Sequence, residues 1–202
     1  MAVQNSSPDF RDCTFSQNST TSATNGGALR IVGTSSPTLR RCTLEGNTAL
    51  GSGGAIAHEG DLLRLIRCDF IDNQAGTSPD DPRGGGTLQN LANATVVDCF
   101  FAGNSATGLG GAVYSNAPNK QVTLTNCAFS GNSANTQGGA VFTDWSDPRF
   151  TNCTFHANQA GTSGGGLFRN FGDPILTNCI LWGNTAGSAG DEAAQITGSG
   201  RI

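Results

Sequence analysis

A cysteine recurs along this chain at nearly constant intervals, and an asparagine stands five positions after each one. The steps from one cysteine to the next are 29, 26, 31, 28, 26 and 26 residues. A fixed period of this length is typical of architectures in which one short unit stacks on the next. The repeat therefore constrains the fold more than any single motif does. The cysteines are Cys13, Cys42, Cys68, Cys99, Cys127, Cys153 and Cys179, and the asparagines are Asn18, Asn47, Asn73, Asn104, Asn132, Asn158 and Asn184.

Apolar residues occupy fixed places around each cysteine. One large apolar residue follows the cysteine by two positions and another precedes it by three, as Phe155 and Phe150 do around Cys153. Side chains alternate between the two faces of a strand, so Cys153 and Phe155 share a face. An offset of three cannot place Phe150 on that face within one flat strand. We therefore predict a corner before each cysteine, a second bend at the Gly-Gly pairs in mid-repeat, and about three short strands per repeat.

These strands are expected to stack as an all-β, parallel β-helix, a solenoid of about seven rungs of roughly 26 residues. Equivalent residues then lie above one another, which predicts stacked phenylalanines, a cysteine ladder and an inward asparagine ladder that satisfies backbone groups at a corner. We assign residues 1–190 to one β-helix domain. Residues 191–202 are expected to form a polar C-terminal cap or tail, because polar residues replace the Gly-Gly strand there.

The cysteines are predicted to be free thiols that pack as small buried apolar groups. Their even spacing provides no Cys-x-x-Cys pair of the kind that builds a zinc site. Neighbouring cysteines in a parallel stack have parallel Cβ vectors, which hold their Cβ atoms farther apart than the ~3.8 Å that a disulfide prefers. We therefore expect neither a zinc site nor disulfides along this row.

Composition argues against two classes of partner. Eleven basic and fifteen acidic residues give a formal net charge of -4, and no run of Lys or Arg is present that could neutralise a phosphate backbone. Nucleic-acid binding is therefore not expected. The sequence also lacks the ~18 consecutive apolar residues that a membrane-spanning helix requires, so we predict no transmembrane segment.

Two phrases in the repeat carry a family resemblance. Residues 126–134 read Asn-Cys-Ala-Phe-Ser-Gly-Asn-Ser-Ala, and residues 152–160 read Asn-Cys-Thr-Phe-His-Ala-Asn-Gln-Ala. Each is joined to a Gly-Gly pair, and together they closely resemble the polymorphic outer-membrane protein repeats of bacterial secreted proteins. The resemblance spans nearly the whole chain. It implies a right-handed, pectate-lyase-like solenoid that is secreted or displayed at a bacterial cell surface and is concerned with adhesion or display.

The outward positions beside each cysteine indicate no catalytic site. Enzymes that resemble this fold carry acids and bases on the outer face of one sheet, yet these rows pair no carboxylates on neighbouring rungs as a glycosidase requires. Arg41, Arg67 and Asp98 form the densest group of charges, and we interpret them as solvated ion pairs. His58 has no nucleophile beside it in the sequence. We therefore predict a protein that is not an enzyme.

A few side chains remain as candidate ligand-binding groups. Trp145, His156 and Trp182 could stack against a sugar, although a tryptophan on the last rung could instead cover an exposed edge.

Calcium is the one cofactor that the sequence suggests. Asp144, Asp147 and Asp173 recur around two turns of successive rungs, where carboxylate oxygens could converge on calcium. The competing interpretation is that aspartates before proline form local hydrogen bonds at turns.

The favoured function is a non-enzymatic extracellular or cell-surface scaffold for adhesion, display or spacing, whose partner is a carbohydrate or a host or cell-surface protein. One alternative is a polysaccharide-binding or polysaccharide-degrading module. Another is a β-helix that self-assembles end to end, because a terminal rung exposes a sheet edge that can pair with a second chain.

Overall fold

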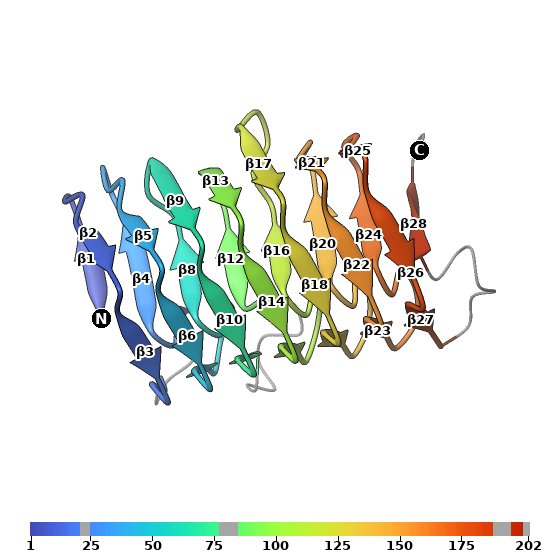
Figure 1. The fold of residues 1–202 in the computed structure, drawn as a ribbon, viewed down its shortest axis with the longest axis horizontal. Helices are drawn as coiled ribbons and strands as arrows, with labels where there is room; N and C mark the ends of the chain where they lie inside the picture. Colours follow the sequence, from blue (N-terminus) through green and yellow to red (C-terminus); the bar gives the residue numbers. More distant parts are fainter. Residues whose placement is uncertain (21–24, 77–84, 188–194, 200–202) are drawn as a thin grey trace.

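The computed structural model describes residues 1–20, 25–76, 85–187 and 195–199. The chain winds as a right-handed parallel β-helix, and its strands lie side by side along the long axis from β1 at one end to β28 at the other (Figure 1). The rungs average about 28 residues, slightly more than the expected 26, because insertions lengthen several of them. In the described ranges no helix is long and apolar enough to cross a membrane.

Four parallel sheets, named A to D, run along the solenoid. Sheet A contains β1 (Ala2–Gln4), β4 (Leu29–Val32), β8 (Ile56–His58), β12 (Leu88–Asn90), β16 (Val113–Ser115), β20 (Val141–Asp144), β24 (Leu167–Asn170) and β28 (Ile196–Ser199). Sheet B contains β2 (Asp9–Arg11), β5 (Thr38–Arg40), β9 (Leu62–Ile66), β13 (Asn93–Val97), β17 (Val122–Thr125), β21 (Arg149–Thr151) and β25 (Ile175–Thr177).

The other two sheets follow sheet B along each rung. Sheet C contains β3 (Thr14–Ser16), β6 (Thr43–Glu45), β10 (Asp69–Ile71), β14 (Phe100–Ala102), β18 (Ala128–Ser130), β22 (Thr154–His156) and β26 (Ile180–Trp182). Sheet D contains the two-residue strands β7 (Thr48–Ala49), β11 (Gln74–Ala75), β15 (Ser105–Ala106), β19 (Ser133–Ala134), β23 (Gln159–Ala160) and β27 (Thr185–Ala186). Most rungs thus hold four short strands, one more than the sequence predicted.

The corner predicted before each cysteine is a single residue in the left-handed region. Asn126 and Asn152 have φ values of 53° and 54°, and the equivalent residues of the other rungs lie between 51° and 54°. Asn and Asp are among the few residue types that tolerate this conformation. One such residue turns the chain from sheet B into sheet C, so the apolar residues on both sides of the corner face the core.

Stacked phenylalanines form the centre of the core, as expected. The ring centroids of Phe70, Phe101, Phe129 and Phe155 lie 4.6 to 4.9 Å apart in successive rungs, and neighbouring rings are within 11° of parallel. All four side chains are fully buried. Burial of each ring contributes about 1.5–3 kcal/mol, and each stacked pair adds about 0.5–1.5 kcal/mol. A chain with few apolar residues therefore still obtains a continuous apolar core.

The asparagine ladder is present and continuous. Each asparagine from Asn18 to Asn158 donates from Nδ2 to Oδ1 of the asparagine on the next rung, at 2.8 to 3.0 Å. From the second rung on, Nδ2 also donates to a backbone carbonyl of the preceding rung, at 2.8 to 3.0 Å. Each Oδ1 from Asn47 onward accepts a backbone N–H as well, so every polar atom of an interior amide is satisfied.

Gln195 ends this ladder at the C-terminal side. Nδ2 of Asn184 donates to Oε1 of Gln195 at 2.7 Å, and Nε2 of Gln195 donates to the carbonyl of Asn184 at 3.1 Å. The glutamine amide thus takes the place that the next asparagine would occupy. Gln195 and β28 belong to the segment expected to form a cap or tail, whose residues 191–194 and 200–202 lie outside the described part of the chain.

The seven cysteines are free thiols, as predicted. The five interior ones are buried, while Cys13 and Cys179 on the terminal rungs are partly exposed. Burial raises the pKa of the Cys42 thiol, and a hydrogen bond with Cys68 together with burial raises the pKa of Cys99. Cys42 and Cys99 therefore stay protonated, and the five interior cysteines pack as small groups of the core.

Candidate functional site

The outer face of sheet A carries a row of three aromatic rings. Tyr114, Phe142 and Phe168 occupy equivalent positions on β16, β20 and β24. Their centroids are 5.7 and 5.4 Å apart, and neighbouring planes differ by 7°. A hollow of about 340 Å³ lies over them and is lined in addition by Leu109, Gln137, Asp144 and Asn170. We call this hollow, with its seven lining residues, the aromatic groove.

Asp144 supplies the carboxylate of the aromatic groove, and two amides hold it in place. Nδ2 of Asn170 donates to its Oδ1 at 3.0 Å, and Nδ2 of Asn116 donates to its Oδ2 at 3.2 Å. Both amides come from neighbouring rungs, so the rigid solenoid fixes the orientation of the carboxylate. Each oxygen still has a lone pair for a ligand, because a carboxylate oxygen accepts two hydrogen bonds. The groove thus combines a fixed acceptor with apolar ring edges.

Trp145 directly follows Asp144, and Phe171 directly follows Asn170, at the corner where sheet A ends. Their rings stack with centroids 4.3 Å apart, and the two residues are 58% and 46% exposed. Both backbones are left-handed, with φ values of 51° and 63°. A large residue in that conformation costs of order 1 kcal/mol or more, and strain of this kind clusters at binding sites. We call this exposed pair the aromatic platform.

His156 and Trp182 form a second exposed aromatic pair, on the outer face of sheet C. Their rings stack with centroids 3.8 Å apart at 15°. Nδ1 of His156 also lies 3.3 Å from the carbonyl oxygen of Trp182. The structure therefore brings together two of the three predicted sugar-stacking residues. The third, Trp145, lies on a different corner and is paired with Phe171, which the sequence analysis did not select.

The three aspartates suggested for calcium have separate partners. Asp144 accepts from two amides, Oδ1 of Asp147 accepts from the backbone N–H of Asp173 at 2.6 Å, and Oδ1 of Asp173 accepts from Nη1 of Arg169 at 3.3 Å. Among the described residues, no group of three or more His, Cys, Asp or Glu side chains is placed to hold a metal ion. The structure therefore does not assemble the three carboxylates into a ligand set. The Asp147 bond joins successive rungs, so it is not the local hydrogen bond that the turn interpretation expected.

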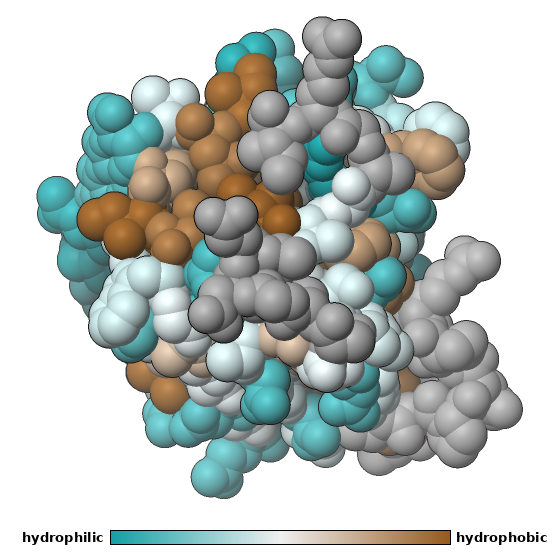
Figure 2. Space-filling model, turned by 90° about the vertical axis from the view of Figure 1, so that its right-hand side faces the viewer, coloured by the Kyte–Doolittle hydropathy of each residue, from teal (hydrophilic) through white to brown (hydrophobic). Residues whose placement is uncertain are grey.

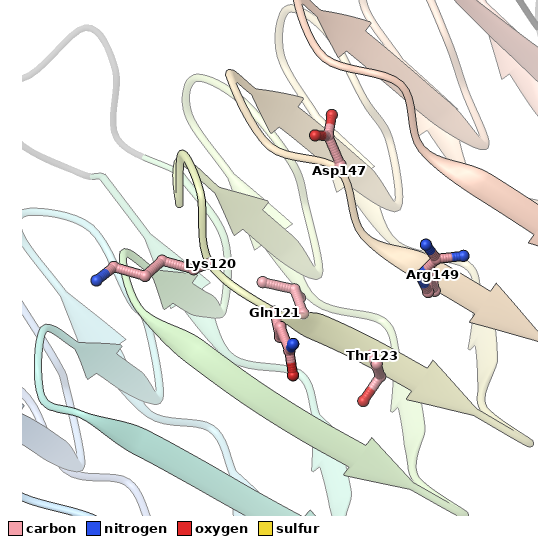
Figure 3. Close-up of a pocket in the computed structure, with 6 residues that line it drawn as sticks. Lys120, Gln121, Thr123, Asp147 and Arg149 are labelled. Atoms are coloured by element: carbon pink, nitrogen blue, oxygen red, sulfur yellow. The ribbon is translucent and has the colours of Figure 1, made fainter.

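A second hollow, of about 430 Å³, lies on the outer face of sheet B. Its charged side chains are Lys120, Asp147 and Arg149, which come from successive rungs. In Figure 3 the Lys120 amino group and the Arg149 guanidinium extend to opposite sides, and the Asp147 carboxylate lies away from both. Charged groups on successive rungs are thus present, but they do not converge on one point as an acid and base must.

The charged corner beside sheet C consists of exposed ion pairs, as the sequence indicated. Arg41 donates to Asp12 at 2.6 and 2.8 Å, which lowers the pKa of Asp12, and Arg67 lies 3.7 Å from Asp98. Such pairs contribute little to stability because solvent screens them.

Sequence reasoning missed the aromatic groove, although a signal for it exists. Tyr114, Phe142 and Phe168 each stand four positions after the first glycine of a Gly-Gly pair. The outward positions beside the cysteines lie on sheet C and at the corner before it, whereas these rings lie on sheet A. A search of every row for recurring aromatics would have found them.

A family model described as "Right handed beta helix region" matches residues 2–147 and 83–201, which together cover nearly the whole chain. A search of curated proteins found no match.

Proposed function

This chain belongs to the right-handed β-helix family, and we propose that it is a non-enzymatic surface scaffold that acts in adhesion. The satisfied asparagine ladder and the stacked phenylalanines provide a rigid rod on which side chains of successive rungs keep fixed positions. A rod of this kind suits display or spacing outside the cell. Its resemblance to repeats of bacterial secreted proteins supports a secreted or cell-surface location.

The observation that carries the adhesive role is the aromatic groove on sheet A with the aromatic platform beside it. Carbohydrates are recognised by aromatic side chains, which contact the apolar faces of the sugar, and by fixed polar groups, which bind its hydroxyls. Trp145 and Phe171 supply exposed apolar surface, and Asp144, Asn170 and Gln137 supply acceptors and donors. We therefore propose a carbohydrate of a cell surface as the partner.

The proposal that the protein binds without catalysis is supported by the groups that line the aromatic groove. Asp144 is the only ionisable residue with a carboxyl group among its described lining residues. Glycoside hydrolysis ordinarily uses two carboxyl groups about 5–9.5 Å apart on either side of the bond that is cleaved. The amides that hold Asp144 favour its use as a fixed acceptor for hydroxyl groups.

A glycan-array screen of three proteins tests this function. The wild type is compared with Trp145→Ala and with a matched control, Trp182→Ala, which removes an equally exposed tryptophan from another face; the two are 58% and 57% exposed. We expect selective binding by the wild type, at least a tenfold loss in Trp145→Ala and retention in Trp182→Ala. Loss of binding in Trp182→Ala alone would instead place the binding site on sheet C. Binding of no glycan by the wild type would refute carbohydrate adhesion.

End-to-end association is a second candidate, favoured by the apolar C-terminal end. Strands β25 and β26 are the last described strands of sheets B and C, and Ile175 and Ile180 on them are 42% and 59% exposed. Figure 2 shows apolar side chains gathered at this end. Gln195 opposes stacking along the asparagine ladder, because its amide occupies the place of the next asparagine. Sedimentation of the wild type and of Ile180→Lys tests this candidate. We expect the wild type to form oligomers and the variant to be monomeric, and a monomeric wild type would contradict end-to-end association.

A further inference from the structure

Besides the asparagine ladder, one inward row of sheet A is polar in most rungs. Its members are in parallel register, each the third residue of its strand. None is more than 1% exposed. The row consists of His58, Asn90, Ser115, Thr143 and Arg169.

The first part of this row finds partners within the protein. Nε2 of His58 lies 3.0 Å from the carbonyl oxygen of Asn93, and the backbone N–H of Gly60 donates to Nδ1 at 3.3 Å. The Oγ atoms of Ser115 and Ser146 are 3.0 Å apart. The rungs that carry these side chains therefore tolerate inward polarity because the protein itself supplies most of the hydrogen bonds.

Asn90 also leaves its Oδ1 without a partner, but the last two rungs of the row differ because the unpartnered atoms there include donors beside a buried cation. Oγ1 of Thr143 and both Nε and Nη2 of Arg169 are buried and have no hydrogen-bond partner in the described structure. Thr143 and Arg169 are direct neighbours across the β20–β24 ladder. Both point inward, so a cluster of N–H and O–H donors without acceptors lies at this end of the core.

The charge of Arg169 is also poorly balanced. Among the described residues, its one ion pair joins Nη1 to Oδ1 of Asp173 at 3.3 Å, and the Asp173 side chain is 80% exposed. No Asp or Glu is among the buried residues of the described chain. A buried cation requires a nearby negative charge, and the usual N–H···O separation in such pairs is about 2.7–2.9 Å. One long contact with a solvated carboxylate does not meet that requirement.

The fold nevertheless encloses Arg169 closely. Gly198 of β28 pairs with Arg169, and a side chain at position 198 would collide with the Arg169 carbonyl oxygen and Cγ. Glycine thus lets β28 cover the arginine, whose side chain is 1% exposed. The last strand of sheet A therefore seals the guanidinium inside the solenoid.

We propose that Arg169 and Thr143 form an internal binding site for a small planar oxyanion of the carboxylate class. The Nε/Nη2 edge of a guanidinium is a planar fork that matches the two oxygens of a carboxylate. The Thr143 hydroxyl can donate a third hydrogen bond. A water molecule would accept from this cluster but would bring no negative charge, whereas a monovalent oxyanion satisfies the donors and neutralises the buried cation.

Formate tests the site through its effect on stability. A ligand that binds only the folded state raises the melting temperature in a saturable way, whatever the path by which it enters. The wild type is melted in increasing sodium formate, with sodium chloride making up a constant ionic strength. We expect a saturable rise specific to formate. Equal melting temperatures in formate and chloride at every concentration would overturn the proposal.

Three variants assign the response to these residues. Thr143→Val removes the third donor at nearly constant volume and should raise the apparent dissociation constant of formate about tenfold. Thr123→Val makes the same change on the outer face of sheet B and should match the wild type. Arg169→Met should abolish the formate-specific rise. If Arg169→Met does not fold, the comparison of Thr143→Val with Thr123→Val tests the proposal instead. Identical formate titrations of these two variants would overturn the proposed site.

Discussion

Replacement of one interior asparagine tests how the ladder holds the rungs together. In Asn104→Leu the side chain keeps nearly the same volume but loses its amide. The backbone N–H of Asn73, which donates to Oδ1 of Asn104 at 3.0 Å, becomes an unsatisfied buried donor, at a cost of about 1–3 kcal/mol. Three side-chain hydrogen bonds are also lost, from Asn104 to the Phe70 carbonyl and to Asn132 and from Nδ2 of Asn73 to Asn104, at about 0.5–1.5 kcal/mol each. Together these terms give an expected loss of unfolding free energy of about 2.5–7.5 kcal/mol.

Asn18→Leu is the matched control, because it makes the same change on the exposed first rung. Asn18 donates to Oδ1 of Asn47, and no preceding rung depends on it among the described residues. We expect a loss of about 1 kcal/mol or less. Urea unfolding followed by circular dichroism measures both variants. Equal losses at the two positions, or an unchanged midpoint for Asn104→Leu, would refute the role assigned to the ladder.

Three further predictions concern the core. Phe129→Ala should cost about 3–5 kcal/mol in urea unfolding, because it empties a fully buried place in the ring stack, whereas Phe171→Ala at the exposed platform should cost much less. Titration with a thiol reagent should detect about two cysteines in the native protein and seven after unfolding without reductant; five or more reacting in the native state would contradict the buried ladder. Burial lowers the pKa of His58 below its ordinary 6.5, so the unfolded chain takes up the proton first as pH falls. Stability should therefore be full above about pH 6.5 and decline below it, and His58→Gln should reduce that decline.

The fold could be predicted because its determinants recur in every rung. The offsets of Cys153, Phe150 and Phe155 required inward strands on both sides of a corner, and the structure has one left-handed residue there. The asparagine five places after each cysteine predicted the ladder for the same reason. Sheet D was missed because its strands have two residues, too few to produce a visible alternation of polar and apolar side chains.

The candidate site was harder to predict, because it depends on which side of sheet A each residue faces. The Gly-Gly corner that precedes Tyr114 and Phe142 sets that orientation, and the sequence analysis assigned no register to the strand that follows. Trp145 was selected for its residue type, yet its partner Phe171 lies a full rung later. The burial of Arg169 was also not expected, since charged residues normally lie at the surface and only the register of β24 turns this one inward.

An NMR titration of the labelled protein with the glycan that it binds best on the array locates the binding site. We expect amide shifts to change at the aromatic groove and the aromatic platform, around Asp144, Trp145 and Asn170, while the sugar signals stay those of the intact glycan. Shift changes confined to the hollow around Lys120 and Arg149 on sheet B, or the appearance of new reducing-end signals, would contradict a non-enzymatic adhesive site on sheet A.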